Sequence, residues 1–391
     1  MRYGGGRSPR VVLLLVTLAL FTDLLLYDLV VPFLPAHLRQ EQVSPIGIGA
    51  LFGAYALALL IATPFTGRWC DRLGARGLLQ GGLLGLLVAT LLCAFTDRFA
   101  MLLAARLCQG VASAALWTAG LALIADAFPA AARGRAMGTA LAGMSAATLL
   151  GPPLGGILFD GGGYRLPFLL GAALVLAVLA LACWLPIAAR AGPQPAPAGL
   201  LGRDRRFLLT AGVVVVGSTV LSLLEPTLPL YLGTRFGASP ATIGLLFGAA
   251  TLAYGICSPL AGMFADRWGG RAALTIGLVA TAVVLPLVCG PGSLPGEIAV
   301  LVLLGIACAF LLAPTLPELA DAADRCGHVP YGSAYSLFSA AYAVGMLLGP
   351  VLGGLATAGL GLAPALVLVS LGIALYVPVF VAIRPRAALP T

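Results

Sequence analysis

Residues 48–76 read IGALFGAYALALLIATPFTGRWCDRLGAR, and residues 243–271 read IGLLFGAATLAYGICSPLAGMFADRWGGR. The two stretches align without gaps at an offset of 195 residues, and 15 of their 29 positions are identical. A shorter pair, GPPLGG at 151–156 and GPVLGG at 349–354, recurs at an offset of 198. Because each long stretch is an apolar run that ends in a charged loop, the chain reads as two duplicated, membrane-spanning halves.

The composition around these repeats supports a membrane protein. Of the 391 residues, 60% are hydrophobic and only 9% are charged, and the mean hydropathy is +1.05. A soluble domain carries about 25% charged residues, so an ordinary soluble enzyme and a disordered chain are both excluded. The apolar runs are continuous rather than alternating, which excludes an outer-membrane barrel.

Twelve apolar segments are long enough to form spanning helices, because about 20 apolar residues cross a bilayer. We predict an all-α membrane protein with twelve transmembrane helices in two pseudo-symmetric six-helix bundles. The predicted domains are an N-terminal bundle at 1–189, a cytoplasmic linker at 190–206 and a C-terminal bundle at 207–391. The predicted segments are about 11–37, 45–66, 77–96, 99–128, 136–159, 166–189, 207–233, 239–261, 272–290, 297–321, 331–358 and 361–383.

The arginines predict the orientation. All 22 basic residues are Arg, and 17 of them lie in the two termini, the central linker and the even-numbered loops. Only four lie in the odd-numbered loops. Because positive charge is retained on the cytoplasmic side, both termini are expected in the cytoplasm. This topology also explains the net charge of +8 without nucleic acid.

No cofactor is expected. The eight cysteines have neither disulfide nor metal-site spacing. The chain has no phosphate-binding Gly-Lys-Ser/Thr motif, so a proton gradient is a more fitting energy source than ATP. The first apolar run has no small-residue cleavage site, so it reads as a first span rather than a signal peptide.

Among the charged residues of the predicted spans, Asp23, Asp28, Arg106 and Glu225 lie well away from the span ends. A charge at such a depth costs roughly 2.5–3.5 kcal/mol, so it indicates a function or a buried partner. Asp23 and Glu225 are interpreted as acids that alternately hold a proton and an organic cation, which would produce exchange by competition. Asp28 lies about 140° around the helix from Asp23. In the alternative, structural reading, the acids pair with Arg106 or a neighbouring helix.

Further motifs are Asp23-LLLYDLVV-Pro32 in the first span, Leu224-Glu225-Pro226 in the seventh and Tyr331-Gly332-Ser333-x-Tyr335 in the eleventh. With these motifs in view, the whole chain resembles the major facilitator superfamily, and more narrowly its twelve-helix drug:proton antiporters, including the vesicular amine transporters. Arg106-x-x-Gln109-Gly110 is similar to that family's helix 4 motif, whose Arg is linked to proton coupling. A third motif is similar to the antiporter sequence of helix 5, with Ala147 in place of one usual Gly. The matching glycines and prolines that would bend or pack helices are Gly151, Pro152, Gly155, Gly156, Gly349 and Pro350.

The resemblance also implies a cytoplasmic gate. The family's loop motif between helices 2 and 3 is matched twice, and Asp126 ends the fourth predicted span. The alternative is that these charges only set topology. The residues assigned to gating are Gly67, Asp71, Arg72, Arg76, Asp126, Asp266, Arg267 and Arg271.

Departures from the vesicular amine transporters concern the substrate site. Tyr55 stands where that family has a Lys in helix 2, and Ser339 stands where it has an acid in helix 11. Tyr342 and Phe338 could line the cavity and offer cation–π contacts, although an aromatic residue in a span is more often core.

The leading hypothesis is a proton-coupled antiporter, not an enzyme, that exports amphipathic, cationic drugs or amines by alternating access. It would act as a monomer in a bacterial inner membrane, with protons, a small organic cation and lipid as its partners. The alternatives are a facilitator or proton symporter for a neutral solute and, more remotely, a non-transporting receptor or scaffold.

Overall fold

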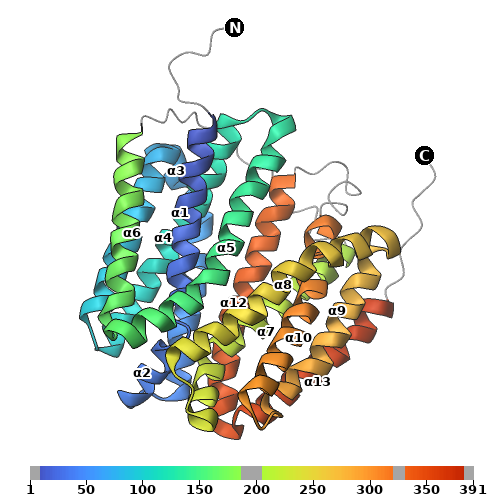
Figure 1. Ribbon diagram of the computed structural model, residues 1–391. Helices are drawn as coiled ribbons and strands as arrows, with labels where there is room; N and C mark the ends of the chain where they lie inside the picture. The colour runs from blue at the N-terminus through green and yellow to red at the C-terminus, as the bar shows by residue number, and fades with distance from the viewer. Residues whose placement is uncertain (1–8, 186–204, 320–330, 383–391) are drawn as a thin grey trace, which may run out of the picture. The chain divides into compact units, whose positions relative to one another are not determined.

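The computed structural model of the chain describes residues 9–185, 205–319 and 331–382, and these ranges are helical almost throughout (Figure 1). Most of the predicted linker at 190–206 lies outside the described residues. The first helices are α1 (Pro9–Leu29), α2 (Leu34–Gln40), α3 (Pro45–Phe95), α4 (Phe99–Ala127), α5 (Ala130–Gly162) and α6 (Arg165–Trp184).

The second part of the chain repeats this series. Its elements are α7 (Arg205–Phe236), α8 (Pro240–Trp268), α9 (Gly270–Val284), the 3₁₀ helix η2 (Leu285–Cys289), α10 (Leu294–Leu312), α12 (Tyr331–Leu360) and α13 (Leu362–Ala382).

Two glycines at equivalent positions separate consecutive spans. Within the 51-residue α3, Gly74 has φ 73° and ψ 154°, which is not helical, so α3 consists of two helices joined at this residue. Gly269, 195 residues later, has φ 90° between α8 and α9. Glycine adopts a positive φ without the steric cost that other residues meet. Among the described residues, eleven helices are long and apolar enough to cross a membrane, and the division of α3 makes them twelve segments.

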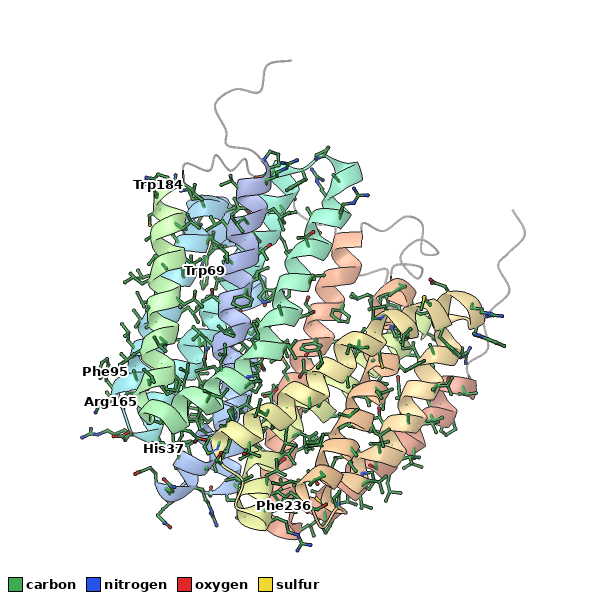
Figure 2. The ribbon with its side chains drawn as sticks, viewed as in Figure 1. His37, Trp69, Phe95, Arg165, Trp184 and Phe236 are labelled. Carbon is green, nitrogen blue, oxygen red and sulfur yellow. The ribbon has the colours of Figure 1, made fainter. Side chains whose placement is uncertain are left out.

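The outward faces of these helices are apolar, as expected of a protein embedded in lipid. Val283 and Leu375 are 62% and 73% exposed, and many other Leu, Ile and Val side chains are exposed on the spans. Trp184 lies at one end of α6, with Arg165 at the other end, where its guanidinium lies 5.8 Å from the ring centre of Phe95 (Figure 2). Aromatic residues at both ends of a span are typical of membrane–water interfaces. The chain is an integral membrane protein.

The described chain divides into two compact units. The first contains α1 to α6 together with Leu228–Gly248, and the second contains the rest of α7 and α8 with α9, η2, α10, α12 and α13. The largest core cluster of the first unit consists of leucines, valines and alanines from α1, α3, α4, α5 and α6.

Close glycine contacts join the first and fifth helices of the first unit. A Cβ atom added to Gly151 would meet Asp28 on α1, and one added to Gly155 would meet the backbone of Leu29. Between these helices Ala147 is fully buried. Small residues spaced four apart therefore let α5 approach α1 at backbone distance.

The second unit uses the same arrangement. An added Cβ at Gly345 would meet Ser218 on α7, and one at Gly349 would meet Ser222. Ser222 Oγ also donates to the carbonyl of Gly345 at 3.1 Å. The packing of α12 on α7 therefore repeats the packing of α5 on α1, in agreement with the duplication seen in the sequence.

Candidate functional site

Asp23 is at the centre of a buried hydrogen-bond chain in the first unit. Its side chain is fully buried on α1, and its Oδ2 accepts a hydrogen bond from Ser113 Oγ of α4 at 2.6 Å. Ser113 in turn accepts a hydrogen bond from the Tyr55 hydroxyl of α3 at 2.8 Å. The other carboxyl oxygen, Oδ1, is buried and has no hydrogen-bond partner among the described residues. One side of the carboxyl is therefore fixed, and the other can accept a proton or a cation.

Asp28 faces a different helix. It is 7% exposed, and its hydrogen-bonding neighbour is Thr148 on α5. Its Oδ2 has no partner among the described residues. Arg106 is the cation that acts electrostatically on Asp28. The two acids of α1 thus meet different neighbours, as their separation around the helix predicts.

Arg106 is buried to 1% exposure on α4 and forms no ion pair within 4 Å among the described residues. Its Nη1 donates to Gln109 Oε1 at 2.9 Å, and its guanidinium carbon lies 5.8 Å from the ring centre of Tyr27 and 5.3 Å from that of Phe52. Nε and Nη2 have no hydrogen-bond partner within the described ranges. An arginine stays protonated at any physiological pH, so this interior carries a permanent positive charge.

A cavity of about 10 Å³ adjoins this arginine. It is lined by Arg106, Gln109 and Thr90, together with apolar side chains of α1, α3 and α6. This volume holds about one water molecule. The cavity therefore has room for one water molecule beside the Arg106 donors that have no protein partner.

The second unit contains four further predicted site residues. Glu225 is half-buried on α7. Phe338 and Tyr342 stack with their ring centres 6.1 Å apart and pack against a small core cluster around Phe207, while Ser339 is exposed.

The first loop motif lies at the end of the first half of α3. Asp71 and Asp126 both act electrostatically on Cys70, so the structure brings the loop acid and the end of α4 together. Asp71, Arg72 and Asp126 are exposed. No atom lies within 4 Å of a Cβ added to Gly67.

The last arginine of each loop motif binds the end of a helix. Arg76 Nη2 donates to the carbonyl of Cys183 near the end of α6 at 2.8 Å. Arg271 Nη2 donates to the carbonyls of Phe380 and Val381 near the end of α13, both at 2.7 Å. Asp266 and Arg267 are exposed, and Arg267 lies 5.7 Å from the ring centre of Trp268. Each arginine satisfies carbonyls that a helix end leaves without partners and adds a cation where the helix dipole favours one.

The helix 5 motif also contacts the first turns of α8. An added Cβ at Gly156 would meet the carbonyl of Pro240, and one at Gly244 would meet the carbonyl of Pro152. Asp160 Oδ2 accepts a hydrogen bond from the amide of Ala241 at 3.1 Å. The glycines and prolines of this motif thus allow two backbones to touch.

Pro350, in the equivalent motif of α12, is buried beside Gly349.

Two buried polar residues, Ser113 and Glu297, were not predicted from the sequence. Ser113 is a common residue in an apolar span, and its role depends on Asp23, which is 90 positions away in the chain. Glu297 lies at a predicted span boundary, where an acid ordinarily faces water, yet it is fully buried at the start of α10. A single acid at the edge of an apolar run was the only signal for it.

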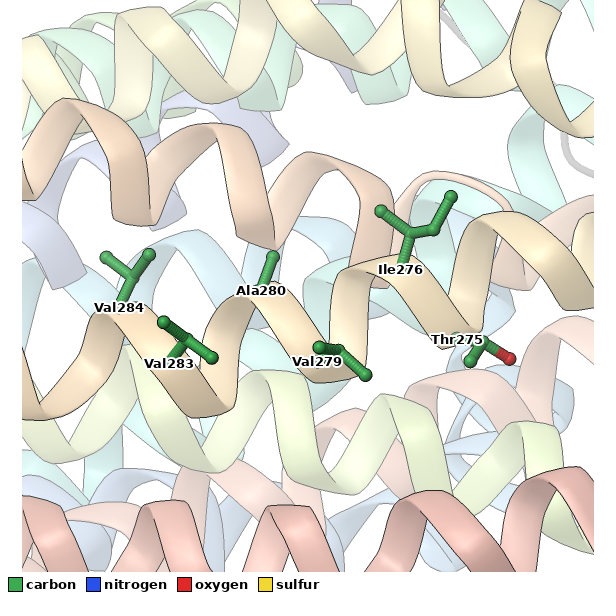
Figure 3. Close-up of a pocket in the computed structure, with 6 residues that line it drawn as sticks. All are labelled: Thr275, Ile276, Val279, Ala280, Val283 and Val284. Carbon is green, nitrogen blue, oxygen red and sulfur yellow. The ribbon is translucent and has the colours of Figure 1, made fainter.

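A second hollow is not part of this chemistry. It measures about 390 Å³ and lies on one face of α9 in the second unit (Figure 3). Its lining contains one polar side chain, Thr275, and its apolar residues include exposed Val279 and Val283. Within the described residues no group of three potential metal ligands occurs.

The comparison with known families is decisive for the fold and the class of protein. The sequence matches the Major Facilitator Superfamily over residues 16–224 and 207–390. The chain belongs to the Major Facilitator Superfamily. Members of this superfamily are transporters rather than enzymes, so this member is a membrane transporter, as the resemblance of its motifs predicts.

Among curated relatives of this superfamily member, the probable vesicular acetylcholine transporter-B of Danio rerio is 34% identical and covers 97% of this chain and 80% of the relative. The chromaffin granule amine transporter of Rattus norvegicus is 30% identical, with 87% of this chain and 66% of the relative covered.

Two solved structures show the same fold at low identity. A bacterial homologue of the human lysosomal transporter Spinster, inward-facing and occupied, superposes with a TM-score of 0.80 at 15% identity, over 97% of this chain and 96% of that chain. The nucleoside transporter NupG superposes with a TM-score of 0.76 at 13% identity, over 95% and 98% of the two chains.

Proposed function

We propose that this transporter exchanges protons for a small organic cation, an amine or an amphipathic cationic drug. The observation that carries the proposal is the Asp23 carboxyl. It is fully buried, one oxygen is held by Ser113, and the other has no partner among the described residues. Such an oxygen can bind either a proton or a cation, and competition between them couples the two flows.

The charges around Asp23 favour different protonation states for Asp23 and Asp28. A buried charge needs an opposite charge nearby, and Arg106 carries one positive charge in this interior. In this proposal Asp28 is the ionised acid and balances Arg106, which acts on it electrostatically. Asp23 then remains neutral by binding a proton, which an incoming cation replaces. The half-buried Glu225 supplies a further acid from the second unit.

The relatives support a cationic substrate. Their names assign acetylcholine or amine transport to proteins that match most of this chain. The Tyr27 and Tyr55 rings, 4.6 Å apart, are aromatic neighbours of the kind that accept an ammonium group. We place the protein in a bacterial inner membrane and expect it to work as a monomer, with the loop motifs serving as its gate.

Transport in proteoliposomes with an imposed pH gradient tests the proposal. We expect the wild type to accumulate a fluorescent organic cation against its gradient. Asp23→Asn should abolish this uptake and weaken cation binding about 10–100-fold, the loss expected for one charged hydrogen bond. The matched control is Asp97→Asn, because the Asp97 side chain is 70% exposed.

Downhill-only movement of the cation by the wild type would instead support a facilitator. Uptake by Asp23→Asn equal to that of wild type would show that the carboxyl is structural.

A further inference from the structure

Glu297 occupies a core position on α10. The buried face of this helix contains Leu301, Leu304, Cys308 and Leu311, spaced three or four residues apart. Glu297 precedes Leu301 by four residues and therefore begins the same stripe. An acid stands where the pattern of the helix requires an apolar side chain.

The carboxyl has no partner that would explain this position. Its exposure is 0%, and neither Oε1 nor Oε2 has a hydrogen-bond partner among the described residues. No cation of the described chain lies within 4 Å of it. An ionised carboxylate without a partner is strongly destabilised in an apolar interior, whereas a neutral carboxylic acid is tolerated.

The described elements packed around Glu297 supply no compensating charge. Cys289, at the end of η2, is the titratable group that interacts with it electrostatically. Helix α9 also packs on α10, and its one basic side chain, Arg271, donates to carbonyls of α13. Arg271 lies at the other end of this helix pair, because the adjacent Gly270 meets Glu318, which is 21 residues beyond Glu297. Cys308 and Tyr254, further along α10 and on α8, are not bases.

We propose that Glu297 is a second proton-binding site, separate from Asp23, at the end of the second unit where α10 begins. It holds a proton in the present conformation and releases it when η2 and α10 open to water. By the distribution of arginines this end faces outward. The role of Glu297 in transport rests on the proposed exchange of protons for cations. Its binding of a proton does not depend on that proposal.

Infrared difference spectroscopy tests proton binding directly. The purified full-length protein in lipid vesicles would be titrated between about pH 6 and pH 9, a range in which an ordinary glutamate stays ionised. We expect the carbonyl absorption of protonated carboxyls to be smaller in Glu297→Gln than in the wild type, by the contribution of one carboxyl group. Glu297→Asp should retain the absorption. Glu41→Gln, which changes an exposed acid, should match the wild type.

Proton counting tests the role in transport. The cation gradient that just balances a given pH gradient gives the number of protons exchanged per cation. We expect Glu297→Gln to exchange one proton fewer than the wild type while still transporting the cation.

Three outcomes would contradict the Glu297 site, its role in transport or the proposed function. An infrared spectrum of Glu297→Gln identical to that of wild type overturns the site, and folding of each variant is checked by its elution as a monodisperse species. If the band is lost but the proton count is unchanged, the site has no role in coupling. If the wild type shows no exchange driven by pH, the proposed function fails, and the infrared result still decides whether Glu297 binds a proton.

Discussion

Ser113 holds the Asp23 carboxyl through one hydrogen bond. Its hydroxyl donates to Asp23 at 2.6 Å, and the Tyr55 hydroxyl donates to Ser113, so the chain of donors ends on the carboxylate. Donation to a carboxylate stabilises the ionised form relative to the protonated one. In the proposed exchange, Ser113 is therefore a positioning residue that would make the proton on Asp23 easier to release.

Removal of this donor should strengthen proton binding. With Ser113→Ala, cation binding should require a higher pH, because the proton competes more effectively. A hydrogen bond to a charged group contributes about 1.5–3 kcal/mol, which corresponds to a shift of about one to two pH units. Binding of the fluorescent cation measured across a pH series checks the direction.

Two further variants separate this role from simple packing. Ser113→Thr keeps the hydroxyl and should restore most of the wild-type pH profile. Tyr55→Phe removes only the outer donor and should shift the profile by less. A uniform loss of binding at every pH in Ser113→Ala would contradict the role assigned to its hydroxyl.

At the scale of the helices, the glycine contacts of α5 with α1 position Asp28. An added Cβ at Gly155 would overlap the backbone of Leu29, and a backbone cannot move aside as a flexible side chain can. The equivalent contact of Gly349 with Ser222 indicates that both units depend on close approach. The chemistry of α1 thus depends on the shape of α5.

Gly155→Ala should therefore separate α5 from α1. Overpacking of this kind costs about 1–3 kcal/mol, and we expect a lower thermal unfolding temperature together with reduced transport. The matched control is Gly161→Ala on the same helix, where no atom lies within 4 Å of the added Cβ. That change should be neutral or slightly stabilising, because alanine favours the helix by up to about 1 kcal/mol. Equal effects of the two substitutions would contradict the packing argument.

At the scale of the whole molecule, the duplication extends to individual hydrogen bonds. Arg76 caps the carbonyls of α6 and Arg271 caps those of α13, and the two arginines are 195 residues apart. The positive-φ glycines Gly74 and Gly269 precede them by two residues. Each unit therefore fixes its last helix to the turn between its second and third helices.

The two caps should contribute independently. Arg76→Gln and Arg271→Gln should each lower stability by about 1 kcal/mol, as the loss of a charged bond to a helix end predicts. Because the arginines lie in different units and donate to different helices, the double variant should show the sum of the two losses. Thermal unfolding of the single and double variants in the same detergent measures this, and a double loss well below the sum would show that the units are coupled through these ends.

The fold class and the main charged residues could be predicted from the amino-acid sequence alone. Lipid offers no partner for backbone groups, so continuous apolar runs can only be helices. A charge in such a run is costly, so Asp23, Asp28 and Arg106 stand out among their apolar neighbours in the chain. The internal repeat predicted the two charged loops, 67–76 and 262–271, whereas the positive φ of Gly74 and Gly269 is known only from the structure.

The partners of these residues, in contrast, depend on tertiary packing. The fold joins Asp23 to Ser113 and Arg76 to Cys183, which are separated by 90 and 107 positions in the chain. It also turns Glu297 into the core rather than to the membrane surface. Helical periodicity fixes which residues share a face, but the rotation and neighbours of each helix depend on how side chains from distant segments pack. The cost of a buried charge can therefore be recognised in the sequence, whereas the atoms that offset it come together only when the helices pack.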